Sequence, residues 1–317
     1  MEHDPVLVAE VTGFLGPALE RGGVVVDATL GRAGHAGALL EAFPTIFLVG
    51  IDRDPVSLEA AGTHLAAHQG RFALVRDNFS DLTSILERLG IASVRGVLLD
   101  LGVSSPQLDE AHRGFSFRDP GPLDMRMDPD ADLSANEIVN TYAQADLEAV
   151  IRDLGEERFA RRIARSIVSR RPVTSTTELA DIVKEAIPAA TRRTGPHPAR
   201  RTFQALRIET NAELAELDAV LPASMDACEP GGRIAAISYH SLEDRRVKRF
   251  FVDEARGCVC PVELPICACG AEANLKLVTR RPVTPSETEI QRNPRARSAK
   301  LRVAERTSAV SPEGASA

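Results

Sequence analysis

Four acidic residues in the first hundred positions each follow a short apolar run. They are Asp27, Asp52, Asp77 and Asp100, and runs such as VVVD and VLLD are rich in the β-branched and aliphatic residues that favour buried strands. Because the carboxyl ends of parallel strands meet at one edge of a sheet, we expect the four carboxylates to converge there. An acidic edge of this kind repels a phosphate and attracts a cationic ligand.

A glycine-rich turn follows the first of these acids, in the stretch DATLGRAGHAG. No Gly-Lys-Ser/Thr follows the turn, which excludes a phosphate-binding P-loop, and the three-residue glycine spacing matches the dinucleotide fingerprint poorly. Asp52 comes about twenty residues after the turn, where an acid binds ribose hydroxyls. Phe79 follows the third strand and can frame an adenine. These features favour S-adenosylmethionine, which has ribose hydroxyls, an ammonium and a sulfonium group but no phosphate.

The elements that must position these residues alternate between strand and helix from residue 24 to residue 100. This alternation predicts βαβ units and a mainly parallel sheet, an α/β fold class with a Rossmann-like core. Residues 108–205 offer only helical patterns, and the sheet resumes with RIAAISYHS at 233–241 and a basic segment at 293–306 that is expected at the sheet edge. We therefore predict a discontinuous core of residues 1–107 and 206–307, an all-helical insertion domain of residues 108–205, and a disordered tail of residues 308–317.

The charge of the chain is unevenly distributed. The net charge is −7, yet the segment 152–207 holds 13 Lys/Arg against 6 Asp/Glu, a local excess of seven positive charges. Two interpretations stay open at this point. The segment forms a basic surface that binds a nucleic acid, or its charges form ion pairs on the helix surfaces. No run approaches the roughly 18 apolar residues of a membrane span, and the acidic N-terminus lacks a secretion signal, so no membrane association and a cytoplasmic location are expected.

Four of the five cysteines lie within twelve residues, at Cys258, Cys260, Cys267 and Cys269. Paired cysteines in a cytosolic protein favour a metal over a disulfide, although the Cys-x-Cys spacing is tighter than in most zinc ribbons. A structural zinc and reduced thiols in a loop both remain open. No cysteine lies beside an activating base, and no metal is expected among the catalytic residues.

The longer motifs resemble one family. HDPVLVAEV, DATLGRAGH, LLDLGVSSPQLD, GPLDMRMD, GEERFARRIA, SYHSLEDR and NPRARSAKLRVAE resemble the bacterial S-adenosylmethionine-dependent methyltransferases that modify the exocyclic N4 of a decoding-region cytosine in small-subunit (16S) ribosomal RNA. The resemblance covers roughly residues 3–306. It implies the small ribosomal subunit and its 16S rRNA as partners and S-adenosylmethionine as methyl donor. The implied donor contacts are Ala33, Gly34, His35, Asp52, Phe79, Asp100 and Gln107.

Two positions depart from the family pattern. Ala33 stands where the family usually has glycine, and its methyl group is expected to be tolerated if φ is negative. Tyr239 stands where the family usually has phenylalanine, so the aromatic ring is retained.

The chemistry of such a reaction needs a proton acceptor, because the lone pair of a cytosine amine is delocalised into the ring. Ser105, in the DLGVSSPQ stretch after the fourth strand, and His240, in SYHSLED after the fifth, are the catalytic candidates. For the second stretch, a helix cap with Ser241 as the N-cap residue is an alternative interpretation. Phe115 and Phe117 are available for base stacking, or else form a local hydrophobic cluster.

The sequence therefore predicts an enzyme that transfers a methyl group from S-adenosylmethionine to cytosine N4 in small-subunit rRNA. Two alternatives remain open: a methyltransferase acting on DNA or a small-molecule amine, and a catalytically idle RNA-binding assembly factor. The oligomeric state, including a homodimer, is left open as well.

Overall fold

The computed structural model describes residues 5–191, 197–257 and 272–308. The chain divides into two compact units, which we call the sheet unit (residues 1–102 and 215–317) and the helical unit (residues 103–214). The predicted boundaries of the insertion were 108 and 205. The four clustered cysteines and nearly all of the predicted disordered tail lie outside the described residues.

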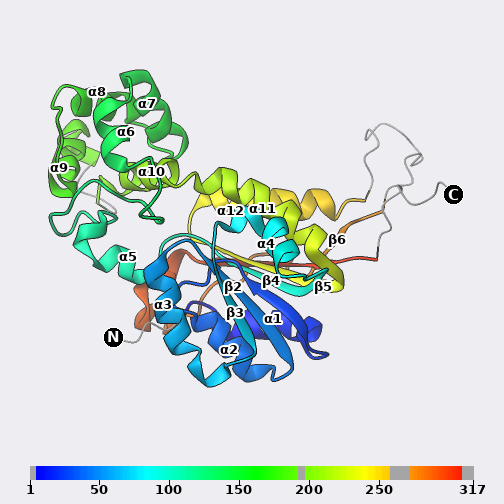
Figure 1. Ribbon diagram of the computed structural model, residues 1–317. Coiled ribbons are helices and arrows are strands. Elements are labelled where there is room, and N and C mark those ends of the chain that lie inside the picture. The colour runs from blue at the N-terminus through cyan, green and yellow to red at the C-terminus, as the bar shows by residue number, and fades with distance from the viewer. Residues whose placement is uncertain (1–4, 192–196, 258–271, 309–317) are drawn as a thin grey trace, which may run out of the picture. The chain divides into compact units, whose positions relative to one another are not determined.

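The sheet unit contains a seven-stranded sheet with the order β3-β2-β1-β4-β5-β7-β6 (Figure 1). The five strands β1 to β5 pair in parallel, whereas β7 runs antiparallel to both β5 and β6. This confirms the α/β class and the mainly parallel sheet. The strands are β1 (Gly23–Asp27), β2 (Ile46–Asp52), β3 (Phe72–Arg76), β4 (Val94–Asp100), β5 (Cys228–Ser238), β6 (Leu275–Leu277) and β7 (Lys300–Arg306).

Helices cover both faces of this sheet, because the central strands are apolar on both sides. In β1, Val25 packs into the cluster that includes Leu15 and Leu39, whereas its neighbour Val26 packs with Ile85 and Val220 on the opposite face. The helices of the unit are α1 (Val8–Leu19), α2 (Gly34–Ala42), α3 (Pro55–His64), α4 (Leu82–Arg88), α11 (Glu213–Ala227, which begins at the end of the helical unit), α12 (Ser241–Glu254) and α13 (Glu287–Arg292).

The basic C-terminal segment forms β7, which lies one strand in from the edge because β6 pairs outside it. Asp244 of α12 holds this strand in place: its two carboxylate oxygens accept hydrogen bonds from Lys300 Nζ at 3.0 Å and Arg302 Nε at 2.7 Å. Burial would raise the pKa of Asp244, but these two cationic donors outweigh it and lower the pKa below its usual value. Two of the segment's basic residues therefore bind the protein itself.

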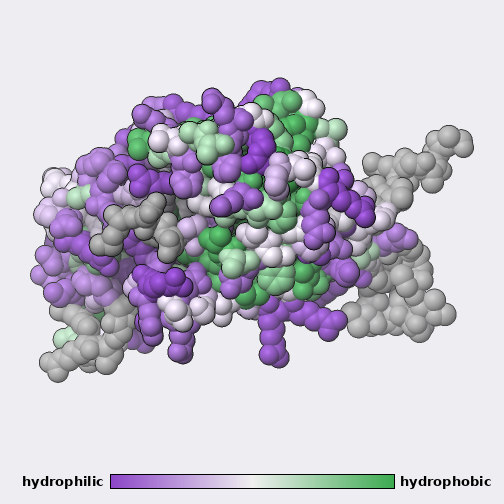
Figure 2. Space-filling model, turned by 90° about the horizontal axis from the view of Figure 1, so that it is seen from below, coloured by the Kyte–Doolittle hydropathy of each residue, from purple (hydrophilic) through white to green (hydrophobic). Residues whose placement is uncertain are grey.

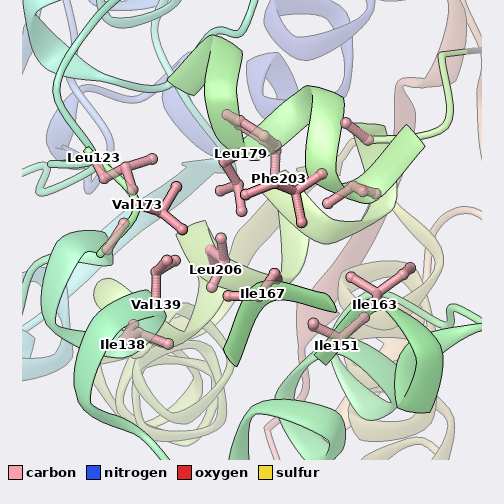
Figure 3. Close-up of a cluster of buried hydrophobic side chains, with 14 of the residues drawn as sticks. Leu123, Ile138, Val139, Ile151, Ile163, Ile167, Val173, Leu179, Phe203 and Leu206 are labelled. Atoms are coloured by element: carbon pink, nitrogen blue, oxygen red, sulfur yellow. The ribbon is translucent and has the colours of Figure 1, made fainter. Parts of the chain in front are cut away.

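The helical unit packs around one apolar core, drawn in Figure 3, which includes Ile138, Ile163, Leu179 and Phe203. Ser134 and Glu137 form a capping box at the start of α6. No strand occurs between residues 103 and 214 in the part of the chain that the structure describes. The helices are α5 (Ser105–Asp109), α6 (Ala135–Thr141), α7 (Gln144–Asp153), α8 (Ala160–Val168), α9 (Thr176–Ala186) and α10 (Arg200–Thr210).

The two phenylalanines of the RGFSF stretch belong to this core. Phe115 is only 6% exposed, and Phe117 packs edge-on against Phe203 with ring centroids 4.8 Å apart. The base-stacking interpretation is therefore wrong for Phe115, and the alternative of a hydrophobic cluster holds. The following PLDMRMD stretch is equally ordered, because Asn211 binds the backbone of both Met125 and Met127.

Hydrophilic residues predominate on the molecular face shown in Figure 2, with smaller apolar patches between them. Within residues 5–191, 197–257 and 272–308, no helix has the length and apolar character required to cross a bilayer.

Candidate active site

The turn between β1 and α2 is tied to the end of the neighbouring strand β2. Gly31, at φ +51°, adopts the left-handed conformation that suits glycine, and its N–H donates to Asp52 Oδ2 at 2.8 Å. The other oxygen, Asp52 Oδ1, accepts from the N–H of Asp54 at 2.8 Å. Burial raises the pKa of Asp52, and the two backbone donors offset part of that rise. Asp52 thus shapes the glycine turn, and each of its oxygens keeps a lone pair for a hydroxyl donor.

Asp27 ends β1 and is 1% exposed. Burial raises its pKa from 3.8 to about 7; His35 acts in the opposite direction, and the charges of Asp100 and Asp52 raise the pKa further. The predicted convergence is therefore confirmed for Asp27, Asp52 and Asp100, which interact electrostatically at the carboxyl edge of the sheet. A cationic group placed among them would relieve their mutual repulsion.

Asp77 is different from the other three acids. Its Oδ2 pairs with the guanidinium of Arg88 at 2.5 Å, and its Oδ1 accepts from the N–H of Asn78. The expectation of four converging carboxylates is therefore wrong at this position, because Arg88 of α4 forms an ion pair with Asp77. Phe79 nearby is half-buried, and the guanidinium of Arg53 lies 5.8 Å from the centroid of its ring.

Asp100, at the end of β4, is held by three other residues of the sheet unit. The Tyr239 hydroxyl donates to Asp100 Oδ1 at 2.8 Å, and the Asp100 N–H donates to Thr29 Oγ1 at 2.6 Å. His35 Nδ1 lies 3.7 Å from Asp100 Oδ2, while His35 Nε2 donates to the carbonyl of Val6 at 2.8 Å. Burial and the charge of Asp100 raise the pKa of Tyr239 well above its usual value, so the phenol stays a neutral donor.

Ala33 and Gly34 form the start of α2. Ala33 is fully buried and has φ +65°, so the condition of a negative φ under which its methyl group was expected to be tolerated is not met. A left-handed conformation strains a residue that carries a Cβ. The glycine usual in the family would avoid this strain. Gly34, the first residue of α2, packs so tightly that an added Cβ would lie 2.8 Å from Pro5 Cγ.

Ser105 and Gln107 belong to the helical unit, in the short helix α5. Gln107 is 6% exposed, and its Oε1 accepts from the N–H of Ser104 at 2.9 Å, completing a capping box. The side chain of Ser105 lies outside the described part of the structure. The predicted roles of both residues stay predictions.

His240 caps α12, in place of Ser241, which the alternative interpretation assigned as the N-cap. Its Nδ1 accepts from the N–H of Glu243 at 3.4 Å, while Nε2 lies 3.0 Å from Glu243 Oε1. Glu243, 2% exposed, in turn accepts at Oε2 from the N–H groups of Tyr239 and His240. This reciprocal arrangement locks the β5–α12 turn that carries Tyr239.

Some residues of this site were missed by sequence reasoning. Thr29 holds the backbone of Asp100 across 71 residues of sequence, and Glu216 accepts from both Arg53 and Asn78. Spacing within the chain gives no signal for such pairs. For the Tyr239 hydroxyl, the departure from phenylalanine was the only signal available.

A model of the MraW methylase family matches residues 1–307 of this chain. The chain is 50% identical over 309 residues to "Ribosomal RNA small subunit methyltransferase H" of Heliobacterium mobile, covering 96% of this chain and 98% of the relative. Proteins of the same name from Heliobacterium modesticaldum and Thermobifida fusca are 49% and 50% identical; 96% of this chain is covered in each case, with 98% and 93% of the relatives.

Proposed function

This chain belongs to the MraW methylase family, and from that premise we propose that it methylates the exocyclic N4 of a cytosine in the decoding region of 16S rRNA. It is an S-adenosylmethionine-dependent rRNA methyltransferase. The family match over residues 1–307, together with relatives about half identical over nearly their full length, is the observation that carries the proposal.

The acidic edge of the sheet fits the methyl donor. S-adenosylmethionine supplies an electrophilic methyl group on a cationic sulfur. Asp52 and Asp100 bring carboxylates to the strand ends without a phosphate-binding lysine or a P-loop, and Asp27 adds negative charge as the pH rises above its pKa of about 7. We assign Asp52 to the ribose hydroxyls, because its oxygens have capacity left for hydroxyl donors after binding Gly31 and Asp54.

The remaining predicted donor contacts keep their assignments within this proposal. His35 and Asp100 face each other, and Phe79 lies at the same edge after β3. The assignment of donor contacts to Ala33, Gly34 and Gln107 rests on the resemblance to the family. Ala33 has φ +65°, a strained conformation for a residue with a Cβ, at the position where the resemblance implies glycine.

Methyl transfer to an exocyclic amine forms an N4–carbon bond while the sulfur–methyl bond of the donor breaks and S-adenosylhomocysteine leaves. One amine proton is released, which an acceptor in the protein or in the solvent must take. Within the proposal, Ser105 and His240 are the candidates for orienting the amine and moving that proton. His240 Nδ1 accepts from the backbone N–H of Glu243, and His240 Nε2 lies 3.0 Å from Glu243 Oε1, so a buried carboxylate stands beside the imidazole. The capping arrangement orients the imidazole in either case.

The natural substrate in this proposal is an assembled or nearly assembled small subunit, because the decoding region is built by folded RNA. The test incubates the protein with methyl-labelled donor and small subunits from cells that lack this enzyme, and then maps the labelled nucleotide. Label on cytosine N4 in 16S rRNA supports the proposal. Label on another atom, or on DNA but not on subunits, refutes it.

A further inference from the structure

Helix α8 carries an unusually one-sided set of charges. Its nine residues include three arginines and no acid, and Arg161, Arg162 and Arg165 are all exposed. The opposite side of the helix is buried in the core of the helical unit through Ala160, Ile163, Ala164 and Ile167 (Figure 3 labels Ile163 and Ile167). We call the three arginines the α8 arginine face.

Three other arginines of the helical unit, in contrast, are engaged within the protein. Arg152 pairs with Asp153 at 2.8 Å, and Arg170 pairs with Glu185 at 2.6 Å. Arg171 donates to the backbone carbonyls of Val139 and Tyr142. In contrast, none of the three arginines of the α8 face has an ion-pair partner among the residues that the structure describes.

The three arginines also project from one side of the helix. Positions 161 and 165 are four residues apart and positions 162 and 165 are three apart, so Arg165 is a helical neighbour of each of the other two. Like charges at these spacings destabilise an isolated helix. A row of phosphates removes that repulsion, and the planar guanidinium binds phosphate oxygens in a bidentate manner.

We propose that the α8 arginine face binds backbone phosphates of the RNA substrate. The proposal rests on the proposed function, because that function makes RNA the molecule this protein must bind. In this proposal both interpretations of the basic segment hold in part. Some of its arginines form ion pairs within the protein, whereas the α8 arginine face binds a polyanion.

The test compares two double variants that lose the same charge. Arg161→Gln with Arg165→Gln removes two arginines of the face, whereas Arg152→Gln with Arg170→Gln removes two arginines that are already paired. All four side chains are exposed, so both proteins should fold, which thermal melting checks. Binding of protein-free 16S rRNA is measured between 50 and 200 mM salt, and KM and kcat are measured on small subunits.

Loss of two phosphate contacts should lower the slope of log affinity against log salt by about 1.5, and should weaken RNA binding about twentyfold at 150 mM salt. We expect this for the Arg161/Arg165 variant, with KM for subunits raised similarly and the donor dissociation constant unchanged. The Arg152/Arg170 variant should show less than a twofold change.

Equal effects in the two double variants would mean that RNA affinity depends only on the net charge of the protein, and this would overturn the proposal. Wild-type affinity and slope in the Arg161/Arg165 variant would overturn it as well. A raised KM on subunits with unchanged binding of protein-free rRNA would assign the face to a ribosomal protein, against the proposal. If the wild-type protein itself fails to methylate rRNA in subunits, the proposed function falls, whatever the RNA-binding comparison shows.

Discussion

Replacing Asp27 by Asn should remove a large pH dependence from the stability of the sheet unit. Asp27 is buried among other acids, and its pKa rises from 3.8 to about 7 on folding. At about 1.4 kcal/mol per pKa unit, this rise corresponds to about 4 kcal/mol. Asn imitates the protonated carboxyl and can still accept the N–H of Thr29, which lies 3.3 Å from Asp27 Oδ1.

The direction of this pH dependence follows from whether the folded or the unfolded chain holds the proton of Asp27. Below pH 3.8 both the folded and the unfolded chain carry a protonated Asp27, and the group does not oppose folding. Between pH 3.8 and about 7 the unfolded chain has lost this proton and the folded chain keeps it, so the free energy of unfolding decreases as the pH rises. Above about pH 7 the full loss is reached.

The assay is urea unfolding followed by far-ultraviolet circular dichroism at pH values from 5 to 8. The difference in unfolding free energy between Asp27→Asn and the wild type should grow with pH, by about 1.4 kcal/mol per pH unit up to about pH 7. Asp77→Asn is the matched control, because that carboxylate also follows a strand but pairs with the exposed Arg88. A difference for Asp27→Asn that stays constant across this range would refute the reasoning.

Substitutions at three further residues test the other parts of the site. Asp52→Ala should weaken donor binding by roughly 1–3 kcal/mol through lost hydrogen bonds to ribose, and an unchanged dissociation constant in calorimetry would contradict the ribose assignment. Tyr239→Phe removes the 2.8 Å hydrogen bond to Asp100 and should lower the unfolding free energy by about 1.5–3 kcal/mol, with weaker donor binding; equal stability of both proteins in urea would mean that the phenol is dispensable. His240→Asn keeps a helix-capping side chain, so stability should change little, whereas methyl transfer should slow by about 100-fold or more if His240 moves the proton. Full methyl-transfer activity in this variant would restrict His240 to its capping role, and His240→Ala should then cost about 1 kcal/mol of stability alone.

Much of the sheet was predictable from the chain because its signals are local. The apolar runs ending in Asp27, Asp52 and Asp100 are long enough to identify strands, and the glycine turn after Asp27 identifies the start of a helix. Parallel strands connected by helices then place their carboxyl ends at one edge. The convergence of these three acids follows from that geometry and needed no tertiary information.

The electrostatic partners of these acids were decided only by the tertiary structure. Arg88 neutralises Asp77, and Tyr239 reaches Asp100 across 139 residues of sequence. A pairing of this kind depends on which side chains the packed strands and helices bring within about 3 Å, and no periodicity in the chain encodes that distance.

A backbone conformation and the burial of a side chain were likewise not predictable from the sequence at two other places. The φ of +65° at Ala33 could not be predicted from the residue type, because it is set by the close turn between β1 and α2. The RGFSF stretch contains Phe115 but does not report that the core of the helical unit covers it. Residue types and their spacing determined the sheet and its acidic edge, whereas the three-dimensional packing decided which side chains remain available to a ligand, because burial and pairing arise only when distant segments meet.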